Sequence, residues 1–170
     1  LHKFKQKSYR IKIIFKFFSN CDECFVSLWA IIDKQGYYMI IDSQLLDNLT
    51  IEARRSPRLR MNYDLRNSSS DKSQRMMNAL EPGTEIPVHR HTQSSETVVV
   101  IRGSIRQNFY DDDGFLTESV VYRAGDPVSI CVVPVNTWHN SESLEPGTII
   151  FEAKDGAYEP LGASDILVVK

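Results

Sequence analysis

The stretch GTEIPVHRHTQSSETVVVIRG, residues 83–103, has the most specific pattern in the sequence. His89 and His91 are separated by one residue, so on an extended strand both imidazoles project from the same face. Glu96 follows the polar link TQSS, which can reverse the chain and direct a carboxylate back toward the two histidines. We therefore expect these three side chains to converge.

A fourth candidate ligand lies farther along the chain. His139 follows Pro134 and the turn at 135–137, in a position from which a neighbouring strand can add a ligand. Three neutral imidazoles and one carboxylate form a mixed nitrogen and oxygen set that suits Fe(II), Mn(II), Ni(II), Co(II) or Zn(II). The sequence therefore predicts one divalent metal ion, of undetermined identity, bound by His89, His91, Glu96 and His139.

The chain after Asp71 has the pattern of an all-β protein. Short apolar or alternating runs follow one another, separated by turn signals such as Asp113-Gly114, which favours a tight hairpin. This spacing is typical of a β-sandwich or barrel. The expected strands are 75–80, 85–91, 97–101, 104–110, 115–122, 128–133 and 148–152.

A short helix is expected before the strands, over residues 43–55. Ser43 can cap it, and Leu45, Leu49 and Ala53 fall on one face at helical spacing. The segment 54–72 that follows is polar and rich in arginine, serine and asparagine, which is typical of an irregular loop.

Residues 83–103 resemble the first cupin motif, and the five motif positions stand at matching spacing: Gly83, His89, His91, Glu96 and Gly103. Pro134 and His139 resemble the second cupin motif. Asn136 stands there in place of the usual glycine, and asparagine tolerates left-handed backbone better than most residues. Ser143 stands where that motif ends in asparagine. The resemblance implies an all-β cupin fold, a double-stranded β-helix or jelly-roll barrel with a short N-terminal helix.

Over roughly residues 39–170 the chain is similar to the WbuC family of cupin-fold metalloproteins, which are found among bacterial surface-polysaccharide genes. The matching stretches are RSPRLRMN, DKSQRMMNALEPGTEIPVHRH, the strand with Glu96, WHN around His139 and FEAKDGAYEP. The chain departs from the family at Ala157 and Tyr63. This resemblance implies a metal-binding cupin that acts on a small sugar-derived metabolite in surface-polysaccharide biosynthesis.

Further candidates for ligand binding flank the metal-ligand strands and match family positions: Gln74, Arg75, Trp138, Glu152, Lys154 and Tyr158. At the barrel mouth, Arg75 and Lys154 could hold a carboxylate or phosphate, with Trp138 as an apolar wall. The expected ligand is an anionic sugar derivative. The alternative for both cations is a solvated face or a structural ion pair with Glu152 or Asp155.

Three functional interpretations remain open, and no catalytic residue is assigned. The first is a metal-dependent enzyme, either an isomerase or epimerase or an oxygenase-type cupin. The second is a non-catalytic carbohydrate-binding or sensory cupin, and the third is a purely structural metal. Arg75 or Glu152 directed at the metal would favour the enzyme, whereas the absence of an acid/base pair would favour the binder.

Composition excludes several function classes. A formal net charge of -2 does not indicate the basic surface that binds nucleic acid. No run provides the roughly 20 apolar residues of a membrane-spanning helix.

Three cysteines at low density indicate a reducing compartment, so we expect a cytoplasmic protein. Cys21 and Cys24 form a CxxC with no second pair, so they and Cys131 are expected to be incidental thiols. A homodimer is left open.

Residues 1–38 form an N-terminal extension with two open interpretations. The chain begins with Leu1, and Met39 stands immediately before the regularly patterned region, which suggests an over-extended gene start. The alternative is a genuine arm whose isoleucine and phenylalanine residues add edge strands to the barrel. The expected division is therefore 1–38 for the extension and 39–170 for the cupin domain, with its barrel starting at about residue 74.

Overall fold

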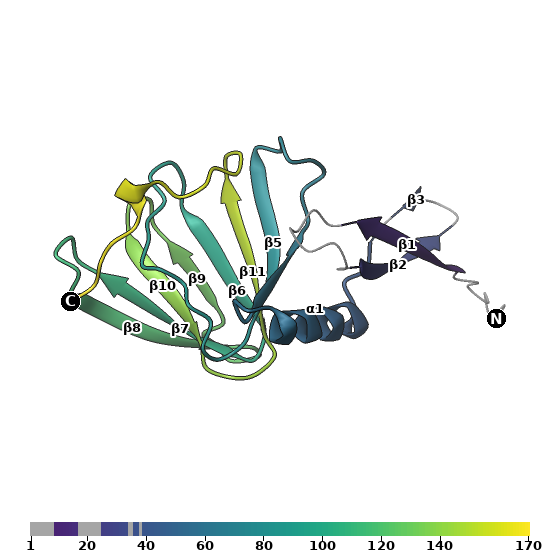
Figure 1. Cartoon of the computed structure of the whole chain (residues 1–170), viewed down its shortest axis with the longest axis horizontal. Helices are drawn as coiled ribbons and strands as arrows, with labels where there is room; N and C mark the ends of the chain where they lie inside the picture. The colour runs from purple at the N-terminus through teal and green to yellow at the C-terminus, as the bar shows by residue number, and fades with distance from the viewer. Residues whose placement is uncertain (1–8, 17–24, 34–35, 38) are drawn as a thin grey trace. The chain divides into compact units, whose positions relative to one another are not determined.

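The computed structural model describes residues 9–16, 25–33, 36–37 and 39–170 (Figure 1). The chain divides into two compact units, Leu1–Asn48 and Leu49–Lys170. Within the described residues no helix is long and apolar enough to cross a membrane. Cys21 and Cys24 lie outside the described residues, and Cys131 is a buried free thiol.

The described strands of the N-terminal unit form a three-stranded antiparallel sheet of their own. It consists of β1 (Tyr9–Lys16), β2 (Phe25–Asp33) and β3 (Gly36–Tyr37), in the order β1-β2-β3. The status of this extension stays a prediction.

The predicted short helix is confirmed as α1 (Ser43–Arg55). Its cap is Asp42, not Ser43. The Asp42 carboxylate accepts a hydrogen bond from the Leu45 N–H at 3.0 Å, while the Asp42 carbonyl accepts one from the Leu46 N–H. A carboxylate at this position also interacts favourably with the helix dipole, which favours aspartate as the cap.

Two antiparallel sheets form the second unit and confirm the predicted all-β cupin fold (Figure 1). The larger has the order β4-β5-β11-β6-β9 and consists of β4 (Arg60–Asp64), β5 (Ser73–Leu80), β11 (Thr148–Asp155), β6 (Glu96–Arg102) and β9 (Ile130–Val133). The smaller has the order β10-β7-β8 and consists of β10 (Trp138–Ser143), β7 (Ser104–Tyr110) and β8 (Leu116–Arg123).

The apolar core lies between the two sheets and draws residues from both. Val98 and Ile150 of the larger sheet share one buried cluster with Ile105 and Tyr122 of the smaller sheet. Because side chains alternate along each strand, one face of each sheet turns inward to supply this core, while Met77, Ala79 and Ile149 are buried on the opposite face of the larger sheet. The same inward faces also carry polar side chains, which form the site described below.

Two strands were not predicted from the sequence, and one expected strand is not continuous. β4 lies within the segment expected to be a loop, and β10 has the polar sequence WHNSES. The buried side chains of β10 include His139, Ser141 and Ser143, so apolar alternation could not reveal it. Residues 85–91 pair only through isolated bridges at His89.

We predict that residues 1–38 are dispensable for the barrel, because both barrel sheets lie entirely after Met39. A chain that starts at Met39 should remain soluble and melt within about 5 °C of the full chain, measured by circular dichroism. Insolubility of the shortened chain would show instead that the extension contributes to the core.

Candidate metal centre

The structure brings the four predicted metal ligands together. His89, His91, Glu96 and His139 each offer one donor atom, and these atoms all lie within 4.8 Å of one another. We call these residues the four-ligand group. Glu96 is the first residue of β6, His139 lies on β10, and the other two histidines lie on the segment that precedes β6.

Backbone hydrogen bonds hold the ligand-bearing segments in place. The N–H groups of His89 and His139 each donate to the other residue's carbonyl, both at 2.9 Å. Asn136 has the left-handed backbone expected of it, with φ 64°, and its N–H donates to the His91 carbonyl at 2.8 Å. The turn before β10 is thereby tied directly to the first pair of histidines.

Two histidines have their tautomers fixed by backbone carbonyls. Nδ1 of His89 donates to the Pro87 carbonyl at 3.0 Å, and Nδ1 of His139 donates to the Thr137 carbonyl at 2.8 Å. Because a carbonyl oxygen can only accept, each Nδ1 carries a hydrogen, which leaves Nε2 as the ring nitrogen that a metal can bind. Metal-bound histidines generally have such an orienting partner on the other ring nitrogen.

The electrostatics favour an ionised Glu96 and a neutral His89. Burial alone would raise the pKa of Glu96, but the contacts of its carboxylate with the His139 and His91 side chains, together with the charge of Lys154, outweigh burial and hold it well below the usual range. Burial and the neighbouring His139 lower the pKa of His89 to about 4. Both groups are therefore in their metal-binding protonation states at neutral pH.

Lys154 places a positive charge against two of the donor atoms. Its Nζ lies 3.1 Å from Glu96 Oε1 and 3.1 Å from His91 Nε2. A metal ion and this ammonium cannot share the single lone pair of the His91 nitrogen, so Lys154 must release it when a metal binds. The contact shows that the four-ligand group attracts a cation.

The donor set fits a divalent first-row transition metal. Three imidazole nitrogens and one carboxylate oxygen suit Fe, Mn, Ni, Co or Zn. Four protein ligands on an ion that accepts six leave positions open for water or for a ligand's oxygen atoms.

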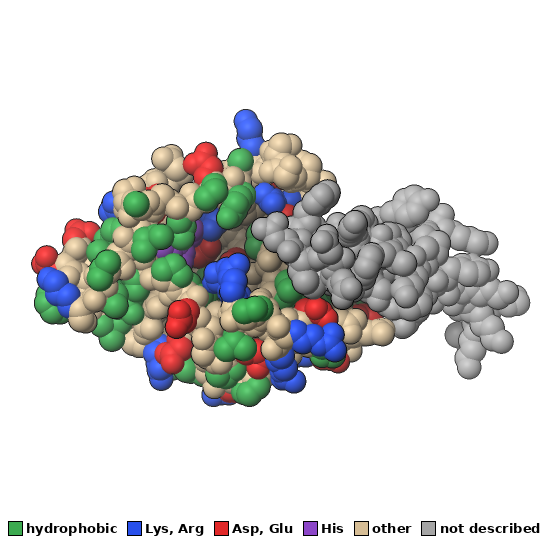
Figure 2. Space-filling model, viewed as in Figure 1, with side chains coloured by type: hydrophobic (Ala, Val, Ile, Leu, Met, Phe, Trp, Pro, Cys, Tyr) green, Lys and Arg blue, Asp and Glu red, His purple; other side chains and the backbone are tan. Residues whose placement is uncertain are grey.

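A cavity of about 480 Å³ adjoins the four-ligand group, within the usual size range of small-molecule sites. His89, Glu96 and His139 form part of its wall. Figure 2 shows a hollow in this face with histidine and basic side chains beside it. The polar and charged residues that line the rest of the cavity are Arg58, Arg60, Asn62, Asp64, Arg66, Gln74, Asn78, Ser141, Glu152, Lys154 and Tyr158.

Of the six predicted ligand-binding residues, Gln74, Glu152, Lys154 and Tyr158 line this cavity. Arg75 does not, because it alternates with Gln74 and lies on the opposite face of β5. The guanidinium of Arg75 is paired with Asp71 at 3.1 Å, which is a structural ion pair with a different partner from those expected.

Trp138 is also absent from the cavity lining. Its Nε1 donates to Asp112 at 2.9 Å, and the guanidinium carbon of Arg90 lies 4.2 Å from its ring centroid. In this arrangement the indole packs under a cation and is not a wall for the ligand.

The residues of β4 and of the segment before it were not among the predicted site residues. Arg58, Arg60 and Asn62 line the cavity although the region was expected to be an irregular loop. The alternation of RMNYD, in which Tyr63 is buried, is the signal that could have identified an edge strand. Five residues are too few to stand out within so polar a segment.

Glu152 is the one cavity carboxyl whose pKa is raised. Burial and the charge of Glu96 raise it to about 8, against the lowering effects of Lys154 and of the Asn78 side chain. Asn78 Nδ2 donates to Glu152 Oε2 at 2.8 Å. A protonated carboxyl beside the four-ligand group can both donate and accept hydrogen bonds.

Comparison with known proteins gives a family model and several solved structures. A domain of unknown function (DUF6016) matches residues 41–122. No curated protein matches the sequence. An oxalate oxidase in complex with the substrate analogue glycolate is 18% identical, with a TM-score of 0.49, and the match covers 62% of this chain and 55% of that chain. This chain therefore spans about half the length of the oxalate oxidase.

Two other similar structures come from bacteria. KdgF from Halomonas sp. is 14% identical, with a TM-score of 0.47, and the match covers 61% of this chain and 84% of that chain. Oxalate decarboxylase from Bacillus subtilis is 20% identical, with a TM-score of 0.46, and the match covers 64% of this chain and 27% of that chain. The ligands and activities that these names state apply to those proteins.

The depressed pKa of His89 predicts a pH dependence of stability. Between its ordinary pKa of 6.5 and about 4, unfolded chains bind a proton that the folded protein excludes. This contribution to the stability of the metal-free protein is thus fully present above 6.5 and is lost as the pH falls toward 4. The loss should reach roughly 3 kcal/mol.

Urea unfolding of wild type and of His89→Gln at about pH 7 and pH 4 measures this contribution. Glu152 acts in the opposite direction, because its raised pKa stabilises the fold as the pH falls, and comparing the two proteins cancels its effect. The stability difference between wild type and variant should shrink or reverse at low pH. A difference that stays constant would contradict the assignment.

Proposed function

We propose that this cupin-fold chain binds one divalent metal ion through the four-ligand group and uses it to bind a small, anionic, sugar-derived metabolite in the adjoining cavity. The observation that carries the proposal is the convergence of four donor atoms within 4.8 Å at the wall of a cavity of about 480 Å³. A metal there would act as a Lewis acid toward oxygen atoms of the ligand.

The chemistry of the cavity supports a polar ligand. Amide and hydroxyl groups from Asn62, Gln74, Asn78 and Ser141 line it, and these groups suit the hydroxyls of a sugar. The cationic side chains in the lining favour negative charge on the ligand. The role in surface-polysaccharide biosynthesis rests on the resemblance of the sequence alone.

Glu152 supports an enzyme over a simple binder. An isomerase or epimerase needs a side chain that can hold and return a proton near the metal-bound ligand, and such groups work best with a pKa near the operating pH. Glu152 has a pKa of about 8 and lines the same cavity as three of the metal ligands. A non-catalytic carbohydrate-binding or sensory protein remains the alternative, and measurement of turnover separates the two.

Elemental analysis of the purified protein tests the metal site. We expect about one divalent ion per chain, and less than about a tenth of that in the double variant His91→Ala/His139→Ala, because loss of two imidazoles leaves too few ligands. The matched control is Glu142→Gln, an exposed neighbour on β10 that should keep its metal. Equal metal content in the double variant and wild type would refute the site.

A thermal-shift screen of the metal-loaded protein tests the ligand class. Phosphosugars, uronic acids and nucleotide sugars form the panel, with neutral and aromatic compounds beside them. A ligand at a hundred times its dissociation constant should stabilise the fold by about 2.7 kcal/mol, and the shift should vanish in His89→Ala. Assays of product and of oxygen consumption on each hit then distinguish an enzyme from a binder. Shifts with neutral or aromatic compounds only would rule out the anionic sugar.

A further inference from the structure

Two arginines in the cavity lining have no electrostatic partner in the part of the chain that the structure describes. Within residues 39–170, neither the Arg58 nor the Arg60 guanidinium has an ion pair or a side-chain hydrogen bond. Other arginines in the same part of the chain are neutralised, as in the pairs Arg54–Glu81, Arg66–Asp64, Arg75–Asp71, Arg106–Glu142 and Arg123–Glu145. The two unpaired charges therefore lie where a ligand can reach them.

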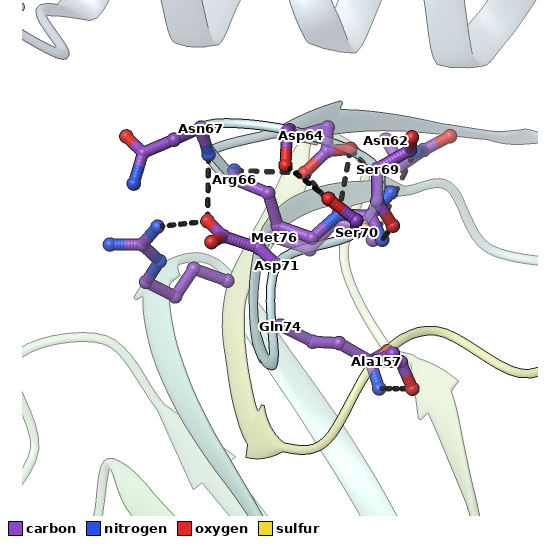
Figure 3. Close-up of polar contacts among 12 residues, drawn as sticks. Asn62, Asp64, Arg66, Asn67, Ser69, Ser70, Asp71, Gln74, Met76 and Ala157 are labelled. Atoms are coloured by element: carbon purple, nitrogen blue, oxygen red, sulfur yellow. Dashed lines mark hydrogen bonds and ion pairs between the residues drawn. The ribbon is translucent and has the colours of Figure 1, made fainter.

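The carboxylates of the cavity are already engaged elsewhere. Asp64 binds Arg66 through both oxygens, at 3.0 and 2.7 Å, and Figure 3 shows the two side chains directed at each other. Glu152 accepts a hydrogen bond from Asn78. Glu96 faces Lys154 and the histidines. No carboxylate in the cavity lining balances the two arginines.

The backbone between the two arginines is held in an unusual conformation. Leu59 has φ 53°, in the left-handed region that a leucine rarely adopts. Its carbonyl accepts hydrogen bonds from the Glu81 N–H at 2.9 Å and from Thr84 Oγ1 at 2.6 Å. Strained backbone held by such fixed partners is common where side chains must be positioned for a ligand. Arg58 and Arg60 flank this residue, and both line the cavity.

We propose that Arg58 and Arg60 form a phosphate subsite at the β4 side of the cavity, so that the ligand is a phosphorylated polyol that reaches from these arginines to the metal. This inference rests on the proposed function, because it names the ligand of the same cavity. Two guanidinium groups supply paired donors and two positive charges, which match the geometry and charge of a phosphoryl group.

The sheet order determines the distance that the ligand must span between the arginines and the metal. β4 is separated from β6, which carries Glu96, by β5 and β11. Three strand spacings amount to about 14 Å across the sheet. The register adds to this separation, because Arg60 lies opposite Leu80 and Thr148, whereas Glu96 lies opposite Lys154 at the other end of β11. A phosphate ion at the arginines therefore does not touch the metal. Asn62, Asn78 and Glu152 line the space between, and their amide and carboxyl groups suit hydroxyls. Phosphate, polyol and metal-binding oxygens thus follow one another along the cavity.

The first experiment isolates the arginines from the metal. Inorganic phosphate is titrated into chelator-treated wild type at constant ionic strength, with the melting temperature as the readout. We expect a saturable upward shift in wild type that is lost in Arg58→Gln/Arg60→Gln and retained in the control Arg55→Gln/Arg106→Gln, which removes two exposed arginines from elsewhere. Equal shifts in all three proteins, or none in wild type, would overturn the subsite.

The second experiment compares glucose 1-phosphate, glucuronate and glucose on metal-loaded protein by calorimetry. Each single variant, Arg58→Gln or Arg60→Gln, should weaken glucose 1-phosphate binding about tenfold, as expected for loss of a hydrogen bond to a charged group. Glucose should be unaffected. Circular dichroism and metal content of the variants should equal those of wild type. If only glucuronate binding depends on the arginines, the phosphate assignment is wrong.

These experiments keep the two claims separate. If the protein contains no metal but phosphate binding still depends on Arg58 and Arg60, the metal site fails and the subsite stands. If metal is bound and the arginine variants bind phosphate and glucose 1-phosphate as wild type does, the subsite fails and the metal site stands.

Discussion

The two-way backbone hydrogen bond between His89 and His139 is the constraint on which the site depends. It joins the irregular segment before β6 to β10 of the other sheet, with both bonds at 2.9 Å. Together with the hydrogen bond from the Asn136 N–H to the His91 carbonyl, it fixes the distance between His139 and the ligands that lie close together in sequence. These contacts also explain why residues 85–91 need not form a continuous strand, because isolated bridges at His89 and the bond to His91 position the imidazoles.

Burial of the four-ligand group works against stability in the metal-free protein. Glu96 and His139 are almost fully inaccessible, and buried charged or polar groups lower stability unless they are paired. Lys154 and the histidines provide that pairing around the carboxylate. A bound metal would replace the Lys154 contact with stronger ligation, so the site is better explained by ligand binding than by any contribution to the core.

The sequence predicted the four-ligand group because the chemistry lies in fixed spacing along residues 83–103 and in one histidine after a turn. It predicted the fold class because the apolar strands alternate strongly. It could not reveal β10, whose inward side chains are polar because they belong to the site, or β4, which is short and polar. It favoured Arg75 over Arg58 and Arg60, since only strand register shows which face of β5 a residue occupies.

X-ray absorption spectroscopy of the metal-loaded protein tests the central claim most directly, because it reports the atoms bound to the ion. The account predicts a first shell of nitrogen and oxygen at about 2.0 to 2.2 Å, with the outer-shell scattering of three imidazoles and no sulfur. Loss of one imidazole in His139→Ala should reduce that outer-shell signal. A shell that contains sulfur, or one made only of water oxygens without imidazole scattering, would contradict it.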